Sequence, residues 1–102
     1  MPLILPWQDT NGMSAWHLYV VQLKKGNKRH DVFKALRAAG INVNVHYIPV
    51  HMQPFYQKLG FKMGDFPHAE KYYASAISLP IYFGLTDEEQ GYVIEKLREN
   101  VW

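Results

Sequence analysis

The chain has 102 residues, the length of one ordinary domain, and 48% of them are hydrophobic while 20% are charged. This balance excludes an intrinsically disordered chain, and the surface scaling of globular proteins predicts that a compact fold of this size exposes roughly 6,000 Å². The net charge of +2 is too small to indicate a nucleic-acid or membrane surface by charge alone. Because the chain has no cysteine, it has no disulfide framework, zinc ribbon, iron–sulfur site or thiol nucleophile.

The first fourteen residues predict an irregular lead-in, because they contain two prolines and a polar turn sequence; the folded domain is expected at 15–102. We do not expect a targeting segment at 1–7, since its apolar run is short and lacks both a basic region and a small-residue cleavage site. No window approaches the roughly 18 apolar residues that a membrane span needs. The expectation is a soluble chain, with the cytoplasm as its default location and with neither membrane nor nucleic acid as a partner.

Residues 15–24 predict a strand, because they are rich in β-branched and aromatic side chains and contain neither glycine nor proline. Apolar residues fall on both faces of this segment, which indicates a central strand covered on both sides. His17 is interpreted as a structural residue buried in mid-strand. The polar residues 24–28 predict a turn.

A helix is expected over 30–39, with Gly40 at the left-handed position after its last turn. Its inward stripe consists of three apolar residues at helical spacing, Val32, Phe33 and Leu36. A second strand is expected over 41–48, where apolar and polar residues alternate. That alternation predicts that His46 and Tyr47 point to opposite faces.

The second half of the chain predicts three helices, at 54–59, 67–76 and 86–100, and a very short strand at 77–79. The helix at 67–76 is expected to turn four residues inward, Ala69, Tyr72, Tyr73 and Ala76. Thr86 and Glu89 form a capping box at the start of the last helix. The order β-α-β-α-α-β-α predicts an α+β fold, a small mainly antiparallel sheet with packed helices. The third strand is expected to be antiparallel and to lie between the first two.

The densest polar cluster is the sequence His46-Tyr47-Ile48-Pro49-Val50-His51. Two imidazoles at a strand end and in the following loop suit a substrate contact, since such loops often carry binding residues. The structural alternative is that His46 is a half-buried strand residue and His51 caps the next helix. A metal site is not expected, because the two histidines give fewer ligands than zinc needs and only Asp65 or His68 are available to add to them.

Other chemistry has weaker signals. No serine lies in a nucleophile elbow, and no glycine-rich phosphate loop is present. The basic cluster of Lys24, Lys25, Lys28 and Arg29 is interpreted as a solvated turn. Aromatic residues make up 15% of the chain, which predicts that some remain exposed for an absent partner surface.

Six short motifs occur in order along the chain: Ser14-Ala15-Trp16-His17-Leu18-Tyr19-Val20, Leu36-x-x-x-Gly40-Ile41, His46-Tyr47-x-Pro49-x-His51, Phe66-Pro67-x-Ala69-Glu70, Ser78-Leu79-Pro80 and Leu85-Thr86. From about residue 2 to residue 100, this series resembles the C-terminal segment of the DegT/DnrJ/StrS sugar aminotransferases. The sequence at 43–56 resembles most the branch that forms UDP-4-amino-4,6-dideoxy-N-acetyl-altrosamine or serves spore coat polysaccharide synthesis. That branch acts on UDP-linked 4-keto-6-deoxy-N-acetylhexosamines.

The resemblance implies the small C-terminal domain of a fold-type I aminotransferase that uses pyridoxal phosphate. It also implies that the Schiff-base lysine, the carboxylate facing the pyridine nitrogen and most phosphate contacts belong to a missing N-terminal large domain. Seven lysines of this chain lie in the wrong segment for the Schiff-base role, namely Lys24, Lys25, Lys34, Lys58, Lys62, Lys71 and Lys96. We therefore expect no catalytic residue in this chain, no cofactor bound to it, and no activity from it alone.

By the same resemblance, the small domain closes the substrate cleft, and the loop from His46 to His51 reaches the nucleotide-sugar. His46, Tyr47 and His51 are the expected substrate-binding residues. The full-length parent is expected to be a homodimer that takes its amino group from glutamate or glutamine. The alternative is a free-standing α+β interaction domain without a catalytic role.

Overall fold

The computed structural model describes residues 1–25 and 28–102, so Gly26 and Asn27 of the predicted turn lie outside the described residues. The elements within these residues are β1 (Leu3–Ile4), β2 (Tyr19–Leu23), α1 (Arg29–Ala38), the 3-10 turn η2 (Val50–Met52), α2 (Pro54–Lys58), α3 (Pro67–Ser75), β3 (Ala76–Leu79) and α4 (Asp87–Val101). This composition confirms the α+β class. Each predicted helix forms, with its ends within one residue of the expected positions.

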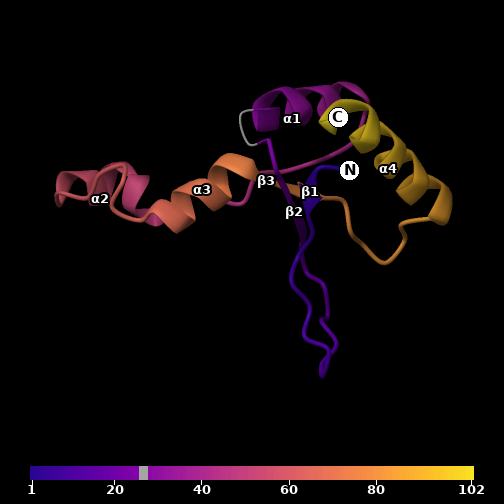
Figure 1. Cartoon of the computed structure of the whole chain (residues 1–102), viewed down its shortest axis with the longest axis horizontal. Coiled ribbons are helices and arrows are strands. Elements are labelled where there is room, and N and C mark those ends of the chain that lie inside the picture. The colour runs from indigo at the N-terminus through magenta and orange to yellow at the C-terminus, as the bar shows by residue number, and fades with distance from the viewer. Residues whose placement is uncertain (26–27) are drawn as a thin grey trace.

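A three-stranded antiparallel sheet, in the order β1-β2-β3, organises the molecule (Figure 1). Leu3 of β1 pairs with Leu23 of β2, and Val21 of β2 pairs with Ile77 of β3. The predicted antiparallel orientation of the last strand is therefore confirmed. The strand β1 was not predicted, because it lies in the segment expected to be irregular; the division between 1–14 and 15–102 itself stays a prediction.

The central strand β2 is shorter than the predicted strand at 15–24. β3 pairs with residues 19–22 and β1 with residues 22 and 23, so the described strands offer no partner to residues 15–18. His17 consequently lies before the strand and is exposed, and its interpretation as a buried residue was wrong. Coverage of both faces was also overestimated, since Val20 and Gln22 are only half-buried.

The segment 41–48 forms a single bridge instead of the predicted strand. Asn44 and Ser78 exchange both backbone hydrogen bonds, at 3.1 and 2.8 Å, across the outer edge of β3. The ladder stops there because β3 is only four residues long, with α3 directly before it and Pro80, which has no N–H to donate, directly after it. β3 does lie between β2 and this bridge, as the predicted crossover requires.

Helix α1 ends as its sequence predicts. Gly40 has φ of 83°, and its N–H donates to the carbonyl of Arg37 at 3.0 Å while the N–H of Ile41 donates to Leu36 at 3.0 Å. These two bonds make a Schellman cap, which glycine permits because it lacks a Cβ.

Helix α4 begins at the predicted Thr86 cap. The hydroxyl oxygen of Thr86 accepts from the N–H of Glu89 at 3.1 Å, and the hydroxyl donates to the Glu89 carboxylate at 2.9 Å. The second bond of the box thus joins the two side chains, whereas in the usual capping box it reaches the backbone of the cap residue.

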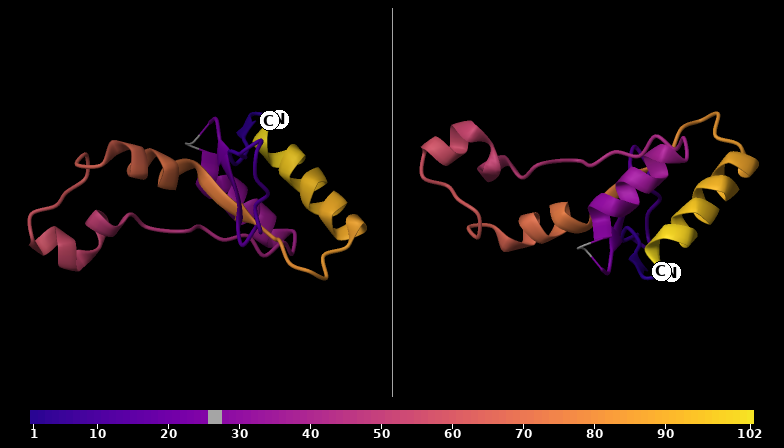
Figure 2. Two further views of the ribbon diagram at one scale, coloured as in Figure 1. Left: turned by 90° about the horizontal axis from the view of Figure 1, so that it is seen from below. Right: turned by 90° about the horizontal axis from the view of Figure 1, so that it is seen from above.

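Helices α1 and α4 lie side by side over the sheet and close the hydrophobic core (Figures 1 and 2). The core residues come from both helices, the sheet and the chain after α1: Leu23, Val32, Leu36, Ile41, Val43, Ile77, Leu97 and Val101. Phe33 packs against this cluster, so the predicted stripe of α1 is confirmed. No helix in the described part of the chain is long and apolar enough to cross a membrane.

The segment 49–75, which we call the arm, leads away from the sheet and carries η2, α2 and α3 (Figures 1 and 2). Because α3 runs along the arm, Ala69 and Tyr72 are exposed and not inward as predicted. Tyr73 is half-buried, and Ala76 is buried as part of β3. The arm therefore has little core of its own.

The molecule is more extended than the sequence predicts for a compact fold. Its radius of gyration is 15.3 Å, against about 13 Å for a compact domain of this length. Its accessible surface is 7528 Å², well above the roughly 6,000 Å² that the scaling law gives. Several large apolar side chains on the arm are exposed, namely Val50, Phe55, Tyr56, Leu59, Phe61, Met63 and Phe66. This confirms the prediction that aromatic residues remain exposed.

Candidate functional site

His46 is held against the edge of the sheet by Ser78. Its Nδ1 lies 2.7 Å from the hydroxyl oxygen of Ser78, and that serine is 4% exposed. Ser78 also forms the backbone bridge with Asn44. The segment that precedes the arm is therefore fixed to β3 both through the backbone of Asn44 and through the side chain of His46. The half-buried His46 ring thus has one nitrogen engaged by the sheet.

Tyr47 follows directly and extends into solvent, with 73% of its surface exposed. Its ring contacts the His46 ring edge to face, with the centroids 4.6 Å apart. The predicted placement of the two side chains on opposite faces was wrong, because it assumed a strand where the chain forms only the bridge at Asn44. The Tyr47 hydroxyl makes no hydrogen bond to any described residue and is available to a ligand.

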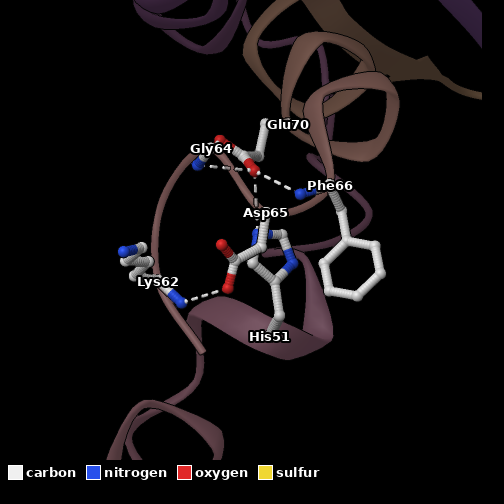
Figure 3. Close-up of polar contacts among 6 residues, drawn as sticks. All are labelled: His51, Lys62, Gly64, Asp65, Phe66 and Glu70. Carbon is white, nitrogen blue, oxygen red and sulfur yellow. Dashed lines mark hydrogen bonds and ion pairs between the residues drawn. The ribbon is translucent and has the colours of Figure 1, made fainter. Parts of the chain in front are cut away.

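His51 lies in η2 at the start of the arm and is only 6% exposed. Its Nε2 is 2.9 Å from Oε2 of Glu70, and its ring packs against the Phe66 ring at 4.8 Å between centroids (Figure 3). The structure thus anchors the two histidines separately, His46 to the sheet and His51 to α3.

Glu70 is the polar centre of the arm (Figure 3). Its carboxylate accepts the N–H of Gly64 at 2.8 and 3.0 Å and the N–H of Phe66 at 3.1 Å, besides the bond to His51. Desolvation, the largest single effect, raises the pKa of Glu70, but the hydrogen bonds from Gly64, Phe66 and His51 together bring the pKa below its ordinary value. Glu70 is therefore an ionised acceptor that joins η2 to the start of α3.

This arrangement predicts a loss of stability in acid. A carboxylate whose pKa is lower in the folded state stabilises the fold at pH values above its unfolded pKa, and it loses that contribution as the pH falls through the folded value. The stability difference between the unaltered chain and Glu70→Gln should thus be constant near neutral pH and shrink as the pH falls below about 4.5, the ordinary pKa of a glutamate. Denaturant unfolding of both chains across this range measures it, and a difference that persists undiminished in acid would contradict the assignment.

Sequence reasoning missed Ser78 and Glu70, although each lies in a motif that it singled out. Glu70 is four residues after Phe66, the residue before α3, and its side chain reaches back to the N–H of that residue. That spacing is one residue longer than in a capping box, and it was the signal available in the sequence. Ser78 gave no local signal, because its partner His46 is 32 residues away.

The other candidate residues take structural positions. Asp65 accepts the N–H of Lys62 at 2.9 Å, and no group of three or more His, Asp or Glu gathers for a metal among residues 1–25 and 28–102. Arg29 is not part of a solvated turn, since it donates to the carbonyl of Tyr73 at 2.9 Å and lies over the Tyr73 ring. Lys24 and Lys25 are exposed, as predicted for a solvated turn.

Over nearly all of its length the fold is that found in solved sugar aminotransferases. The putative sugar aminotransferase Spr1654 of Streptococcus pneumoniae, in its PMP form, matches with a TM-score of 0.91 and 31% identity, covering 98% of this chain and 26% of Spr1654. DesV of S. venezuelae, solved in complex with a ketimine intermediate, matches with a TM-score of 0.86 and 31% identity, covering 97% of this chain and 26% of DesV.

The sequence matches the family pattern over residues 2–98, and the chain belongs to the DegT/DnrJ/EryC1/StrS aminotransferase family. The spore coat polysaccharide biosynthesis protein SpsC of Bacillus subtilis (strain 168) is 43% identical over 104 residues, which cover 97% of this chain and 27% of SpsC. The chain therefore spans about a quarter of the length of the relatives it matches.

The family implies pyridoxal phosphate, which is held covalently by a lysine in an enclosed site. The lysines of this chain do not occupy such a position, since Lys28 and Lys96 are half-buried and the other six are exposed. Lys96 pairs with Glu99 at 3.3 Å, on the outer side of α4. The described residues thus do not fit a covalently held pyridoxal phosphate.

Proposed function

We propose that this chain is the C-terminal small domain of an aminotransferase that uses pyridoxal phosphate, and that it is inactive alone. The whole enzyme transfers an amino group to a nucleotide-linked keto-deoxysugar for surface polysaccharide synthesis in the cytoplasm. The chain closes one side of the substrate cleft, and a large N-terminal domain supplies the cofactor and its lysine. The parent is a homodimer.

One observation carries this proposal: the chain matches its family almost end to end, yet spans only about a quarter of each relative. The extended shape and the exposed apolar residues of the arm support it, because monomeric soluble proteins rarely leave large contiguous apolar surface uncovered. A free-standing interaction domain is the second candidate. A surface without large exposed apolar residues would favour that candidate, whereas this chain exposes many of them.

The substrate contacts proposed in this chain are His46, Tyr47 and His51. Tyr47 offers an unengaged hydroxyl, and each histidine has one ring nitrogen engaged by the protein and the other left over. Phenol and imidazole groups suit the hydroxyls and diphosphate oxygens of a nucleotide-sugar. The histidine anchors, Ser78 and Glu70, hold the rings in place before the ligand binds.

A chimera tests the proposal. This chain replaces the matching quarter of SpsC, and the product is assayed with UDP-linked 4-keto-6-deoxy-N-acetylhexosamine and with glutamate or glutamine as donor. We expect the chimera to show the cofactor's visible absorbance and to aminate the sugar, whereas the isolated chain does neither. Formation of a borohydride-stable bond between pyridoxal phosphate and one lysine of the isolated chain would contradict the proposal.

In the same chimera, His51→Ala is expected to weaken nucleotide-sugar binding about 10- to 100-fold, since a hydrogen bond to the ligand is lost, and to leave the cofactor absorbance unchanged. Isothermal titration with the nucleotide-sugar measures the change. His68→Ala is the matched control, because His68 is an exposed histidine on α3 outside the site. If the His51 and His68 variants bind the nucleotide-sugar with equal affinity, His51 does not contact it.

A further inference from the structure

The Glu70 carboxylate engages one nitrogen of His51 and leaves the other uncommitted. The two side chains are shielded together, with 6% of the His51 side chain and 12% of the Glu70 side chain exposed. An ionised carboxylate only accepts hydrogen bonds, so the Nε2 atom that faces it must carry the hydrogen. The N–H groups of Gly64 and Phe66 fix the carboxylate from the other side, so it cannot turn away.

The second ring nitrogen, Nδ1, lies on the side of His51 that faces Phe66 (Figure 3). It makes no hydrogen bond within the described part of the chain. Among the described residues, every fully buried side-chain nitrogen or oxygen has a hydrogen-bond partner. Because Nδ1 has no such partner, it is not fully buried and retains contact with solvent. The His51 residue lines an apolar hollow of about 380 Å³ on the arm, whose walls include Pro49, Tyr56 and Phe61.

We infer that Glu70 is a positioning residue that acts through His51: it holds the proton on Nε2 and presents Nδ1 to the nucleotide-sugar. This inference rests on the proposed function and deepens it. In the neutral ring Nδ1 is a hydrogen-bond acceptor, so the group it meets is a donor. A sugar hydroxyl or acetamido N–H fits this requirement, and a diphosphate oxygen does not.

A double-mutant cycle in the chimera tests whether Glu70 acts through His51. We expect Glu70→Ala to raise the KM for the nucleotide-sugar about 10-fold with little change in kcat, because it releases the ring that contacts the ligand. In the His51→Ala background the same substitution should change the KM no further, since the ring it positions is gone. Glu70→Gln, which keeps an acceptor oxygen, should restore most of the affinity.

Glu89→Ala is the matched control for the cycle. Glu89 also accepts hydrogen bonds at the start of a helix and also has a lowered pKa, because of the bonds from Tyr82 and Thr86, but it lies outside the site. Its effect on KM should be small and the same with or without His51. If Glu70→Ala raises the KM by the same factor in both backgrounds, Glu70 only braces the arm and the inference is overturned.

Nitrogen NMR on the 102-residue chain separates this inference from the proposed function. At mildly alkaline pH, the His51 ring is expected to show a protonated, hydrogen-bonded Nε2 and an unprotonated Nδ1, and Glu70→Ala should abolish the slowly exchanging Nε2 proton signal. A proton on Nδ1 in the unaltered chain would overturn the inference even if the chimera is active. The expected signals together with an unaffected KM in His51→Ala would instead refute the proposed substrate contact and with it the role of Glu70.

Discussion

Replacing Leu36 with alanine is expected to lower the free energy of unfolding of this chain by about 2–5 kcal/mol. Leu36 of α1 is 0% exposed and belongs to the core cluster together with residues of α4 and the sheet, so its removal leaves a cavity that the neighbouring side chains fill only in part. A domain of this size has only about 5–15 kcal/mol of stability in total. Each kcal/mol corresponds to about 4–8 °C, so thermal unfolding followed by circular dichroism should show a large fall in Tm.

Leu59→Ala is the matched control, because it removes the same atoms from a leucine that is 63% exposed at the end of α2. In the isolated chain its effect should stay within about 0.5 kcal/mol. In the chimera the same substitution should lower the free energy of unfolding by a larger amount if the rest of the enzyme covers the arm. Equal losses from the Leu36 and Leu59 substitutions in the isolated chain would contradict the core assigned here.

The helices were predictable because their signals are local. The stripe of Val32, Phe33 and Leu36 and the following Gly40 define α1 within a dozen residues, and the Thr86 cap defines the start of α4. Each of these signals acts through neighbours three or four residues apart, a distance that the helix itself fixes. No knowledge of the rest of the fold was needed.

The strands were less predictable, because a strand exists only where a second one pairs with it. The segment 41–48 has the alternation of a strand but finds one pairing position on β3, at Ser78. Leu3 and Ile4 have no strong strand signal, yet they pair with the free edge of β2. The burial of α3 also depends on the rest of the fold: its aromatic residues suggest a core face, but the helix lies on the arm, where Tyr72 is exposed and Tyr73 is only half-buried.

Only part of the candidate site was predictable from the sequence. The spacing of His46, Tyr47 and His51 was visible in the sequence, but the partners that fix the two rings come from distant segments. Ser78 is 32 residues from His46, and Glu70 is 19 residues from His51. Such contacts arise from the packing of the arm and the sheet, so single-sequence reasoning identified the residues that we propose to contact the ligand and missed the groups that hold the two histidine rings in place.

Replacing Tyr47 with phenylalanine in the chimera is expected to weaken nucleotide-sugar binding about 10-fold or more. The substitution removes one hydroxyl, and a hydrogen bond to a charged ligand group such as a diphosphate oxygen contributes about 1.5–3 kcal/mol. Because the Tyr47 side chain is 73% exposed and its hydroxyl bonds to no described residue, the stability of the isolated chain should not change by more than about 0.5 kcal/mol. Titration calorimetry and thermal unfolding measure the two quantities.

Tyr72→Phe separates a specific contact from a general effect of removing an exposed phenol. Tyr72 lies on α3, is 39% exposed, and its hydroxyl likewise makes no hydrogen bond within the described residues. Its removal should leave both affinity and stability unchanged. If Tyr47→Phe binds the nucleotide-sugar as tightly as Tyr72→Phe, the exposed end of the 46–51 segment faces another surface of the enzyme. The substrate contacts of this chain would then be limited to the two anchored histidines.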